Sequence, residues 1–527
     1  MSRKKLLKFE ELTVEQKLGM VLCARKFYGA DEDNVGFIVE LIKNHALGCV
    51  QLNANLHEVN QRILEAADYP LLVFNDTERG FPTSTLPKVP LMSLAACDNP
   101  AYYRSFARCI ARDAKAAGFN GTWGPVIDTT HGDGPCKVHR TFSDDPEKVG
   151  ETAEIIAEVF REYGYLSTGK HYPSPDHGPV DTHMAGAYSN DTPEDLFAGS
   201  LKPYLYLMDR GLLPCIMTGH TTLTKIDPDY PASLSKKVID LIRARGFDGL
   251  CFTDSFAMMG ILQKYGEENV YGLAIAAGND IVLPNYRTDT RRCYEMLKKN
   301  FEDGMLPMER LDEAVRRVLK AQEFVAAGED IVVPASKADE DALYAVARDC
   351  ITAVTDEGVS AKLPDSGKKR LFIIVTQNDF KPNPDDQEIT DGKWYYPDRI
   401  AKKIHEEFPD ARIEYLPEFP QASHNERVLV AATGCDEVVF VTFCTTSAYL
   451  GTDCLTRRVE SVINSLLLSG KVEAVVHFGN PYALCPIHHV KRRIFGYLIP
   501  ESQLHAIEVL SGRLEAKGKL PYRVELP

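Results

Sequence analysis

Short apolar runs alternate with amphipathic segments through the first three fifths of the chain. The apolar runs lie at residues 47–52, 71–74, 121–127, 166–171, 215–217, 250–252 and 280–283. Between them, apolar side chains recur every three or four positions near residues 100–117, 146–163, 193–211, 235–245 and 265–278. Buried strands that alternate with helices form parallel sheets, and about 300 residues of such alternation predict a (β/α)8 TIM-type barrel.

Other segments place the ends of this barrel and a second domain. Helical patterns at 13–26 and 35–46 precede the first apolar run, a long one at 309–327 ends the barrel, and 334–341 is polar. Further apolar runs at 370–375, 437–443, 472–478 and 493–496 indicate a second α/β unit. We therefore predict a barrel domain over 1–333, a linker over 334–347 and an α/β sandwich domain over 348–527.

Composition narrows the possible partners of the 527-residue chain. The formal net charge of −15 argues against nucleic acid and anionic membranes as partners. None of the apolar runs approaches the ~20 residues that span a bilayer, and residues 1–10 have the basic start of a signal peptide without an apolar core after it. The 13 cysteines are scattered, as in cytoplasmic proteins. We expect a cytoplasmic protein, and the sequence does not indicate its oligomeric state.

Most of the apolar runs end in polar residues. These residues are Asn53, Asp76, Asp128, Lys170 with His171, His220 and Asp254. Because the carboxyl ends of barrel strands open into one mouth, such residues predict an active site there. Asp254 follows the run 250–252 after one intervening residue, so its carboxylate points into that mouth or caps the next helix.

A second pair of candidate residues lies in the loop after residue 171. Asp181 and His183 are two positions apart, beyond a stretch rich in proline and glycine. In an extended segment their side chains point the same way, and a carboxylate beside an imidazole fixes its tautomer and stabilises its protonated form. This pattern indicates an acid/base dyad, and the alternative is a surface loop with a chance Asp-x-His.

Taken together, the segments resemble glycoside hydrolase family 3. The motifs are Asp76-Thr77-Glu78-Arg79-Gly80 for D-x-E-G-G, Gly124-Pro125-Val126-Ile127-Asp128 for A-P-V-x-D, Arg140-Thr141-Phe142 for R-S-F, Lys170-His171-Tyr172-Pro173 for K-H-F-P, Met217-Thr218-Gly219-His220 for M-x-A-H, and 246–254 for the nucleophile strand. Residues 518–521 are similar to the G-K-L-P that closes the family's second domain. The motif order matches over about 70–284, so the resemblance is specific.

Within that family, K-H-F-P followed by D-[ST]-H resembles the β-N-acetylglucosaminidase branch. The resemblance implies that Asp254 is the nucleophile and His183 the acid/base, oriented by Asp181. It also implies that the substrate is held by Asp76, Arg140, Lys170, His171, Met217 and His220. Two departures from the family pattern are Ser174-Pro175-Asp176 in place of G-H-G and Arg79 in place of a glycine.

The implied activity is that of a retaining β-N-acetylglucosaminidase (β-N-acetylhexosaminidase) acting by double displacement on a small carbohydrate. Such a reaction needs no metal or organic cofactor, because an imidazole near neutrality can donate the proton. A nearby Lys170 would help to keep Asp254 ionised. Three alternatives stay open: a β-N-acetylglucosaminide phosphorylase with the same residues, a β-glucosidase whose acid/base comes from the second domain, and an inactive sugar-binding protein.

Overall fold

The computed structural model describes residues 4–26, 31–129, 140–175, 180–364, 367–377, 396–444 and 454–527. The chain forms two compact units that are interleaved in sequence. The first comprises Met1–Thr85, Tyr103–Gly134 and Asp145–Glu340, and the second comprises Leu86–Tyr102, Pro135–Asp144 and Asp341–Pro527. Helix α14 (Lys337–Asp349) covers most of the expected linker. The domain boundaries at 333 and 348 stay predictions.

A closed parallel sheet lies at the centre of the first unit. Its strands are β1 (Cys23–Lys26), β2 (Cys49–Leu52), β3 (Leu72–Asn75), β4 (Gly121–Thr122), β5 (Thr168–Tyr172), β7 (Cys215–Thr218) and β9 (Leu250–Thr253). They are ordered β1-β2-β3-β4 and β5-β7-β9. Bridges between Gly121 and Leu166, Phe252 and Ile281, and Leu22 and Val282 join these groups into a ring. Segment 281–282 therefore takes the eighth strand position, and the predicted (β/α)8 barrel is confirmed.

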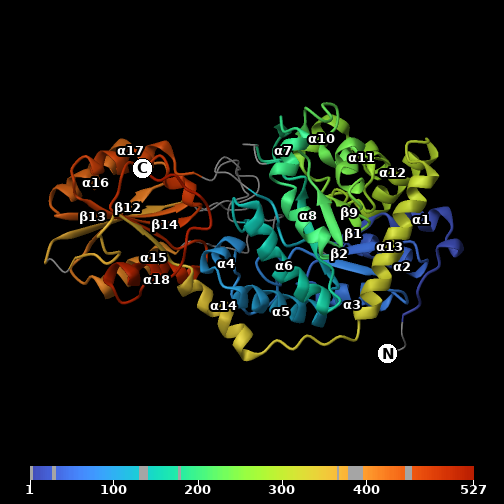
Figure 1. Cartoon of the computed structure of the whole chain (residues 1–527), viewed down its shortest axis with the longest axis horizontal. Coiled ribbons are helices and arrows are strands. Elements are labelled where there is room, and N and C mark those ends of the chain that lie inside the picture. The colour runs from blue at the N-terminus through green and yellow to red at the C-terminus, as the bar shows by residue number, and fades with distance from the viewer. Residues whose placement is uncertain are drawn as a thin grey trace. The chain divides into compact units, whose positions relative to one another are not determined.

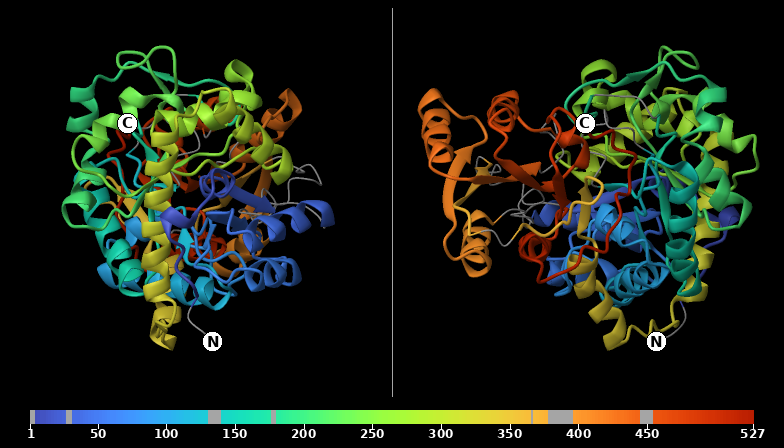
Figure 2. Two further views of the ribbon diagram at one scale, coloured as in Figure 1. Left: turned by 90° about the vertical axis from the view of Figure 1, so that its right-hand side faces the viewer. Right: turned by 60° about the vertical axis from the view of Figure 1, so that its left-hand side comes forward.

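Helices surround this ring on the outside (Figure 1). They are α1 (Val14–Met20), α2 (Glu32–Lys43), α3 (His57–Glu65), α5 (Pro100–Ala116), α6 (Pro146–Glu162), α7 (Pro193–Ala198), α8 (Lys202–Asp209), α9 (Lys236–Arg243), α10 (Met259–Tyr265), α11 (Glu267–Ala277), α12 (Thr290–Glu302) and α13 (Met308–Gly328). Several begin at polar caps, as where the Ser235 hydroxyl accepts the Val238 N–H. The long helix α13 runs along the outside of the barrel in Figure 2.

The helix predicted over 13–26 is wrong in its second half. Helix α1 ends at Met20, and Cys23–Lys26 forms strand β1. Residues 21–24 are all fully buried, because a barrel strand has its inner face in the core and its outer face against helices. Such a strand shows a continuous apolar run instead of an alternating pattern, and next to a helix it cannot be told from another helical turn.

Three aromatic rings fill the barrel interior below its carboxyl end. Phe252 of β9 lies 5.1 Å from Phe74 and 6.2 Å from Trp123, measured between ring centroids. All three side chains are buried. The barrel interior is thus a packed core and not a pore. Asp254 comes two residues after Phe252, on the side of the barrel's carboxyl end.

The second unit is a three-layered α/β structure. Its sheet has the order β10-β15-β14-β13-β11-β12, with β10 antiparallel to β15 and the other pairs parallel. The strands are β10 (Thr352–Thr355), β11 (Arg370–Thr376), β12 (Arg412–Pro417), β13 (Glu437–Cys444), β14 (Val472–Gly479) and β15 (Arg492–Phe495).

Helices cover both faces of this sheet. Helices α16 (Ala422–Thr433) and α17 (Arg457–Leu467) lie on one face, and α15 (Pro397–Glu407) and α18 (Pro500–Ser511) lie on the other (Figure 1). The second α/β domain expected from the sequence is therefore confirmed. Among the residues that the structure describes, no helix combines the length and the apolar character needed to cross a bilayer.

Candidate active site

The predicted strand-end residues of the first unit lie where parallel strands end. Asp76 follows β3, Lys170 and His171 belong to β5, His220 comes two residues after β7, and Asp254 directly follows β9. Pairing in register aligns β7 with β9, so that Thr218 lies beside Thr253. This alignment brings the residues that follow both strands to the same edge of the sheet.

Asp254 sits in a tight turn at the end of β9. Its backbone N–H donates to Thr218 O at 2.8 Å, and its Oδ1 accepts the Ser255 N–H at 2.7 Å. The next helix, α10, begins at Met259 and has Met258 as its N-cap. Asp254 is therefore not a helix cap, and that alternative reading of the sequence is wrong.

Three imidazoles influence the pKa of the Asp254 carboxyl group. Burial raises the pKa of Asp254, but His171, His220 and His183, together with the Ser255 N–H, outweigh it and hold the pKa below its usual 3.8. The carboxylate is thus ionised at neutral pH. These imidazoles, and not the expected Lys170, are the cations that lower its pKa most.

Lys170 lies instead between two other carboxylates. Its Nζ is 2.7 Å from Asp76 Oδ1 and 2.6 Å from Glu78 Oε1, and its side chain is only 3% exposed. A buried ammonium needs such partners, since an unpaired charge there is costly. Glu78 was not among the predicted site residues, although it is the second acidic residue of the D-x-E motif.

His171 is oriented by a buried aspartate. Its Nδ1 is 2.8 Å from Asp128 Oδ2, and its backbone N–H also donates to Asp128. Asp128 is fully buried, and a buried carboxyl group needs such hydrogen-bond donors beside it. Asp128 was predicted to lie at a strand end but was not assigned to the site. The sequence feature that could have assigned it is its place as the last residue of the Gly124–Asp128 motif.

The predicted pair Asp181 and His183 forms a hydrogen bond. The Nδ1 of His183 lies 2.7 Å from Asp181 Oδ1, which also accepts the His183 backbone N–H at 3.0 Å. The Asp181 side chain is 3% exposed and that of His183 is 25% exposed. A chance surface pair would leave both side chains in water. Residues 176–179 of the same loop lie outside the described residues.

The loop that carries His183 is attached to the start of α10. Met259 N–H donates to His183 O at 3.2 Å, and Gly260 N–H donates to Thr182 O at 3.2 Å. A Cβ on Gly260 would lie 2.5 Å from Ala185 O, so only glycine allows this approach. The peptide unit of His183 is therefore fixed relative to the segment that begins at Asp254.

His220 and Met217 are buried in the described structure. The Nδ1 of His220 is 2.8 Å from Ser233 Oγ, and its Nε2 is 3.1 Å from Ser255 O. Burial lowers the pKa of His220, although Asp254 opposes the shift. Met217 lies on β7 between Lys170 and Phe252 in the sheet register. The predicted contact of these two side chains with substrate stays a prediction.

Arg140 belongs to the second compact unit. Its neighbour Ser143 donates to Pro521 O at 2.7 Å within that unit, next to the Gly518–Pro521 motif. The role of Arg140 in sugar binding stays a prediction.

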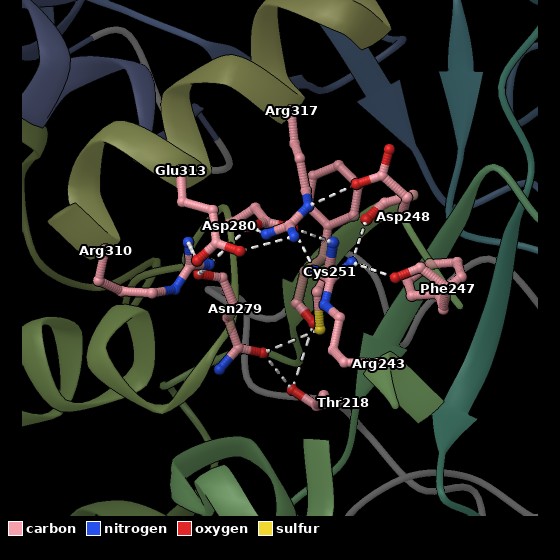
Figure 3. A network of polar contacts seen from close by, with 12 residues as sticks. Thr218, Arg243, Phe247, Asp248, Cys251, Asn279, Asp280, Arg310, Glu313 and Arg317 are labelled. Atoms are coloured by element: carbon pink, nitrogen blue, oxygen red, sulfur yellow. Dashed lines mark hydrogen bonds and ion pairs between the residues drawn. The ribbon is translucent and has the colours of Figure 1, made fainter. Parts of the chain in front are cut away.

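A second polar network holds the opposite, amino-terminal end of β9 (Figure 3). Asp280 is fully buried, and its carboxylate contacts Arg310 Nη2 at 2.6 Å, Arg243 Nη2 at 2.7 Å and Arg317 Nη1 at 3.2 Å. It also accepts the Cys251 N–H at 2.9 Å. Asn279 extends the network to the Thr218 hydroxyl at 2.8 Å. The network thus holds the amino-terminal half of β9, and through Asn279 it also reaches Thr218, the last residue of β7.

No group of three or more His, Cys, Asp or Glu side chains within the described residues has the arrangement of a metal site. The described site contains the Asp254 carboxylate, two imidazoles with aspartate partners, and a lysine between two other carboxylates. Such a set can bind polyhydroxylated molecules and can supply a nucleophile and a proton donor.

Comparison with known proteins identifies the class. Residues 5–321 match the family model described as glycosyl hydrolase family 3 N terminal domain. The chain belongs to this family, and it is an enzyme of the glycoside hydrolase class. The resemblance expected from the motifs is therefore confirmed.

Individual relatives refine the comparison. A protein of Cellulomonas fimi named beta-N-acetylglucosaminidase/beta-glucosidase is 26% identical over 400 residues, 71% of this chain and 70% of the relative. The solved structure of a family 3 beta-N-acetylglucosaminidase from Paenibacillus sp. str. FPU-7 is 22% identical, with a TM-score of 0.79 over 98% of this chain and 100% of that one. The beta-glucoside phosphorylase BglX bound to 2FGlc is 24% identical, with a TM-score of 0.80 over 98% and 95%. Both structures share the fold.

Proposed function

We propose that the protein is a retaining β-N-acetylglucosaminidase with Asp254 as the nucleophile and His183 as the acid/base. The observation that carries the proposal is the Asp254 carboxylate, whose pKa is held down by three imidazoles. One of those imidazoles, His183, is hydrogen-bonded through Nδ1 to the buried Asp181. A nucleophile that stays ionised next to an oriented proton donor is what double displacement requires.

The first step breaks the glycosidic bond. Because Asp254 Oδ1 accepts the Ser255 N–H, Oδ2 is the oxygen that attacks the anomeric carbon. The C–O bond to the leaving group breaks as the Nε2 proton of His183 passes to the leaving oxygen. Asp181 accepts the Nδ1–H, so it stabilises the imidazolium before transfer and leaves Nε2 as the nitrogen that gives up and takes back the proton.

The second step releases the sugar. Water attacks the anomeric carbon of the glycosyl-enzyme, His183 Nε2 takes the proton from that water, and Asp254 leaves as a carboxylate. Two inversions at the same carbon give net retention. A donor with a pKa near neutrality suits both directions of proton transfer. The remaining predicted residues, Asp76, Arg140, Lys170, His171, Met217 and His220, would hold the sugar.

The pair Lys170–Asp76 supports a polar subsite for sugar hydroxyls. Asp76 keeps 47% of its side chain exposed while Lys170 is buried behind it. An exposed carboxylate held in place by a buried ammonium can accept hydrogen bonds from two hydroxyls without moving. This supports a subsite for a neutral sugar and argues against an anionic one.

A phosphorylase is the second candidate. A histidine donor places one negative charge fewer beside the attacking group than a glutamate would, so inorganic phosphate could replace water in the second step. The fold itself is shared with a hydrolase and with a phosphorylase. The proposal of water as the acceptor is therefore tested directly by adding phosphate.

The test is a panel of 4-nitrophenyl β-glycosides of N-acetylglucosamine, N-acetylgalactosamine, glucose and xylose, each with and without phosphate. We expect kcat/KM for the N-acetylglucosaminide to exceed that for the glucoside by about tenfold or more, since a dedicated amide pocket contributes ~1–3 kcal/mol. We expect free sugar as the product in both buffers. Equal cleavage of the glucoside would contradict the branch and favour an acid/base from the second domain. A sugar 1-phosphate would identify a phosphorylase.

A further inference from the structure

The barrel rim beside His183 carries a group of exposed apolar side chains. Five of the large apolar side chains with high exposure fall in the loops that follow β5, β7 and β9; they are Val180, Met184, Tyr188, Tyr230 and Met259. Exposed apolar side chains that occur singly need no explanation, but a group on adjacent loops marks a binding surface.

Two of the tyrosines in this region are held as a rigid stack. The rings of Tyr230 and Tyr265 lie 5.8 Å apart at an interplanar angle of 21°. The Tyr265 hydroxyl donates to Asp229 O, and Lys264 Nζ donates to the same oxygen at 3.0 Å. Because the residue before Tyr230 is tied to α10 in this way, the stack is formed before any ligand arrives, and binding to it loses little side-chain entropy.

Tyr188 extends the same surface towards the loop of His183. It is 58% exposed, and its strand β6 (Tyr188–Ser189) pairs with β8 (Thr222–Leu223). A Cβ on Gly186 would lie 3.5 Å from the Tyr188 hydroxyl and 3.8 Å from Gly260 O. The Tyr188 hydroxyl and Gly260 O thus both lie next to Gly186, near the point where the His183 loop meets α10. Burial raises the pKa of Tyr265, and Tyr188 raises it further.

The residues next to His183 belong to this surface as well. Met184 follows His183 directly, and Met259 N–H donates to His183 O. An acid/base residue lies beside the leaving oxygen, so the side chains that flank it on the solvent side meet the leaving group and not the sugar that is transferred. The aromatic surface therefore borders the leaving-group side of the site.

We propose that Tyr188, Tyr230 and Tyr265, with Met184 and Met259, form an aglycone subsite that binds a second pyranose ring. The faces of a β-linked pyranose carry axial C–H groups that pack on aromatic rings, while its equatorial hydroxyls stay in water, which fits an exposed aromatic surface. The subsite rests on the proposed function, because it is defined by His183 as the proton donor.

The test compares two substrates that differ only on the leaving side. N-acetyl-β-glucosaminyl fluoride has no aglycone ring, whereas N,N′-diacetylchitobiose places a second pyranose there. In Tyr188→Ala and in Tyr230→Ala we expect kcat/KM for chitobiose to fall about three- to tenfold, mainly through KM, and kcat/KM for the fluoride to stay within twofold. Tyr188→Phe should keep the chitobiose activity, because the ring and not the hydroxyl makes the contact.

Tyr344→Ala is the matched control, since Tyr344 is 54% exposed and lies on α14 in the second unit. Tyr344→Ala should leave kcat/KM for both substrates unchanged. Unchanged kcat/KM for chitobiose in both Tyr188→Ala and Tyr230→Ala would overturn the subsite. An equal loss of kcat/KM on both substrates would also overturn it. If the wild type cleaves neither substrate, the proposed function fails and the subsite fails with it. If the wild type cleaves both substrates and the two tyrosine variants cleave chitobiose as fast as the wild type does, the subsite alone fails and the proposed function stands.

Discussion

Two aspartates at the two ends of β9 are both surrounded by basic side chains, but of different kinds. Asp280, beside the amino end of the strand, contacts Arg243, Arg310 and Arg317. Asp254, after the carboxyl end, is under the influence of three histidines. Guanidinium groups keep their charge at every accessible pH, whereas imidazoles gain or lose a proton near neutrality.

This difference separates a structural anchor from a chemical site within one strand. A carboxylate held by permanent cations and a backbone N–H can neither move nor take part in proton transfer, and it fixes the register of β9. A carboxylate near titratable groups has proton donors and acceptors within reach. Barrel enzymes commonly place stability at the amino-terminal face and chemistry at the carboxyl-terminal face, and under the proposed function β9 has both.

The largest expected effect comes from the carboxyl end. Asp254→Asn should lower kcat by at least about 10³-fold, because an amide of the same shape is a poor nucleophile. The unfolding free energy should stay within about 1 kcal/mol of the wild type. Steady-state kinetics and urea unfolding measure the two quantities on the same preparation.

A mechanism-based label gives the control for this variant. A 5-fluoro glycosyl fluoride should modify the peptide that contains Asp254 in the wild type and leave Asp254→Asn unmodified. A label on any other carboxylate would show that the nucleophile has been misassigned, whatever the kinetics of the variant.

His183 should produce the next largest effect, and one that depends on the leaving group. In His183→Ala, a disaccharide should lose roughly 10²–10⁴-fold in kcat/KM, whereas a 2,4-dinitrophenyl glycoside should form the glycosyl-enzyme almost normally. Asp181→Asn should show a milder form of the same pattern, because it only misorients the imidazole. Azide needs no deprotonation, so it should restore turnover of the variant and yield a β-glycosyl azide. Equal losses on both substrates without azide rescue would make His183 a structural residue.

Asp280→Asn should have the opposite effect to Asp254→Asn: a loss of stability with activity retained. It leaves three buried guanidinium groups without their shared carboxylate, and we expect a loss of about 3–5 kcal/mol in the free energy of unfolding. Activity per folded molecule should stay close to that of the wild type at low temperature. Asp248→Asn is a matched control at the same network, because Asp248 contacts Arg317 and Lys320 but is 65% exposed, and it should cost less than about 1 kcal/mol.

The sequence offers candidate residues at the carboxyl end of β9 but none at its amino end. Asp254, His183 with Asp181, and Lys170 follow apolar runs or carry motif spacing, so local pattern and family resemblance could name them as candidates, and their roles stay predictions. Asp280 pairs with arginines of α9 and α13 that are 30 to 37 positions away. Amphipathic periodicity predicts that such helices exist but not which charged side chain meets which carboxylate.

The fold shows the same division between local and distant information. The sequence predicted the central strands of both units, because buried parallel strands are continuous apolar runs. It missed β12 (Arg412–Pro417), whose side chains are partly exposed at the edge of its sheet, and it merged β1 with α1. The partners Asp128 and Glu78 were visible as motif letters, but their contacts with His171 and Lys170 depend on the closed barrel.

The smallest expected effect concerns pH, and it tests whether the histidine end of β9 is titratable where the arginine end is not. Burial holds the pKa of His220 below its usual 6.5. As the pH falls below 6.5, the unfolded chain binds a proton at this residue before the folded protein does, so His220 lowers stability on acidification. Asp254 has the same sign in a more acidic range: its pKa is below 3.8, so its stabilisation is complete above that value and is lost only in stronger acid.

Between pH 8 and pH 5, His220→Gln therefore isolates the first of these two contributions. The variant should lose about 1–3 kcal/mol at pH 8, because Ser233 and Ser255 lose their partner, and this loss should shrink steadily towards pH 5, where the wild type carries its own penalty. The chain has 2 tryptophans, and Trp123 lies 6.2 Å from Phe252 of β9. In a Trp394→Phe background, urea unfolding followed by tryptophan fluorescence thus reports on the barrel alone. A loss that is the same at every pH would mean that burial does not lower the pKa of His220 relative to the unfolded chain, and it would contradict this prediction.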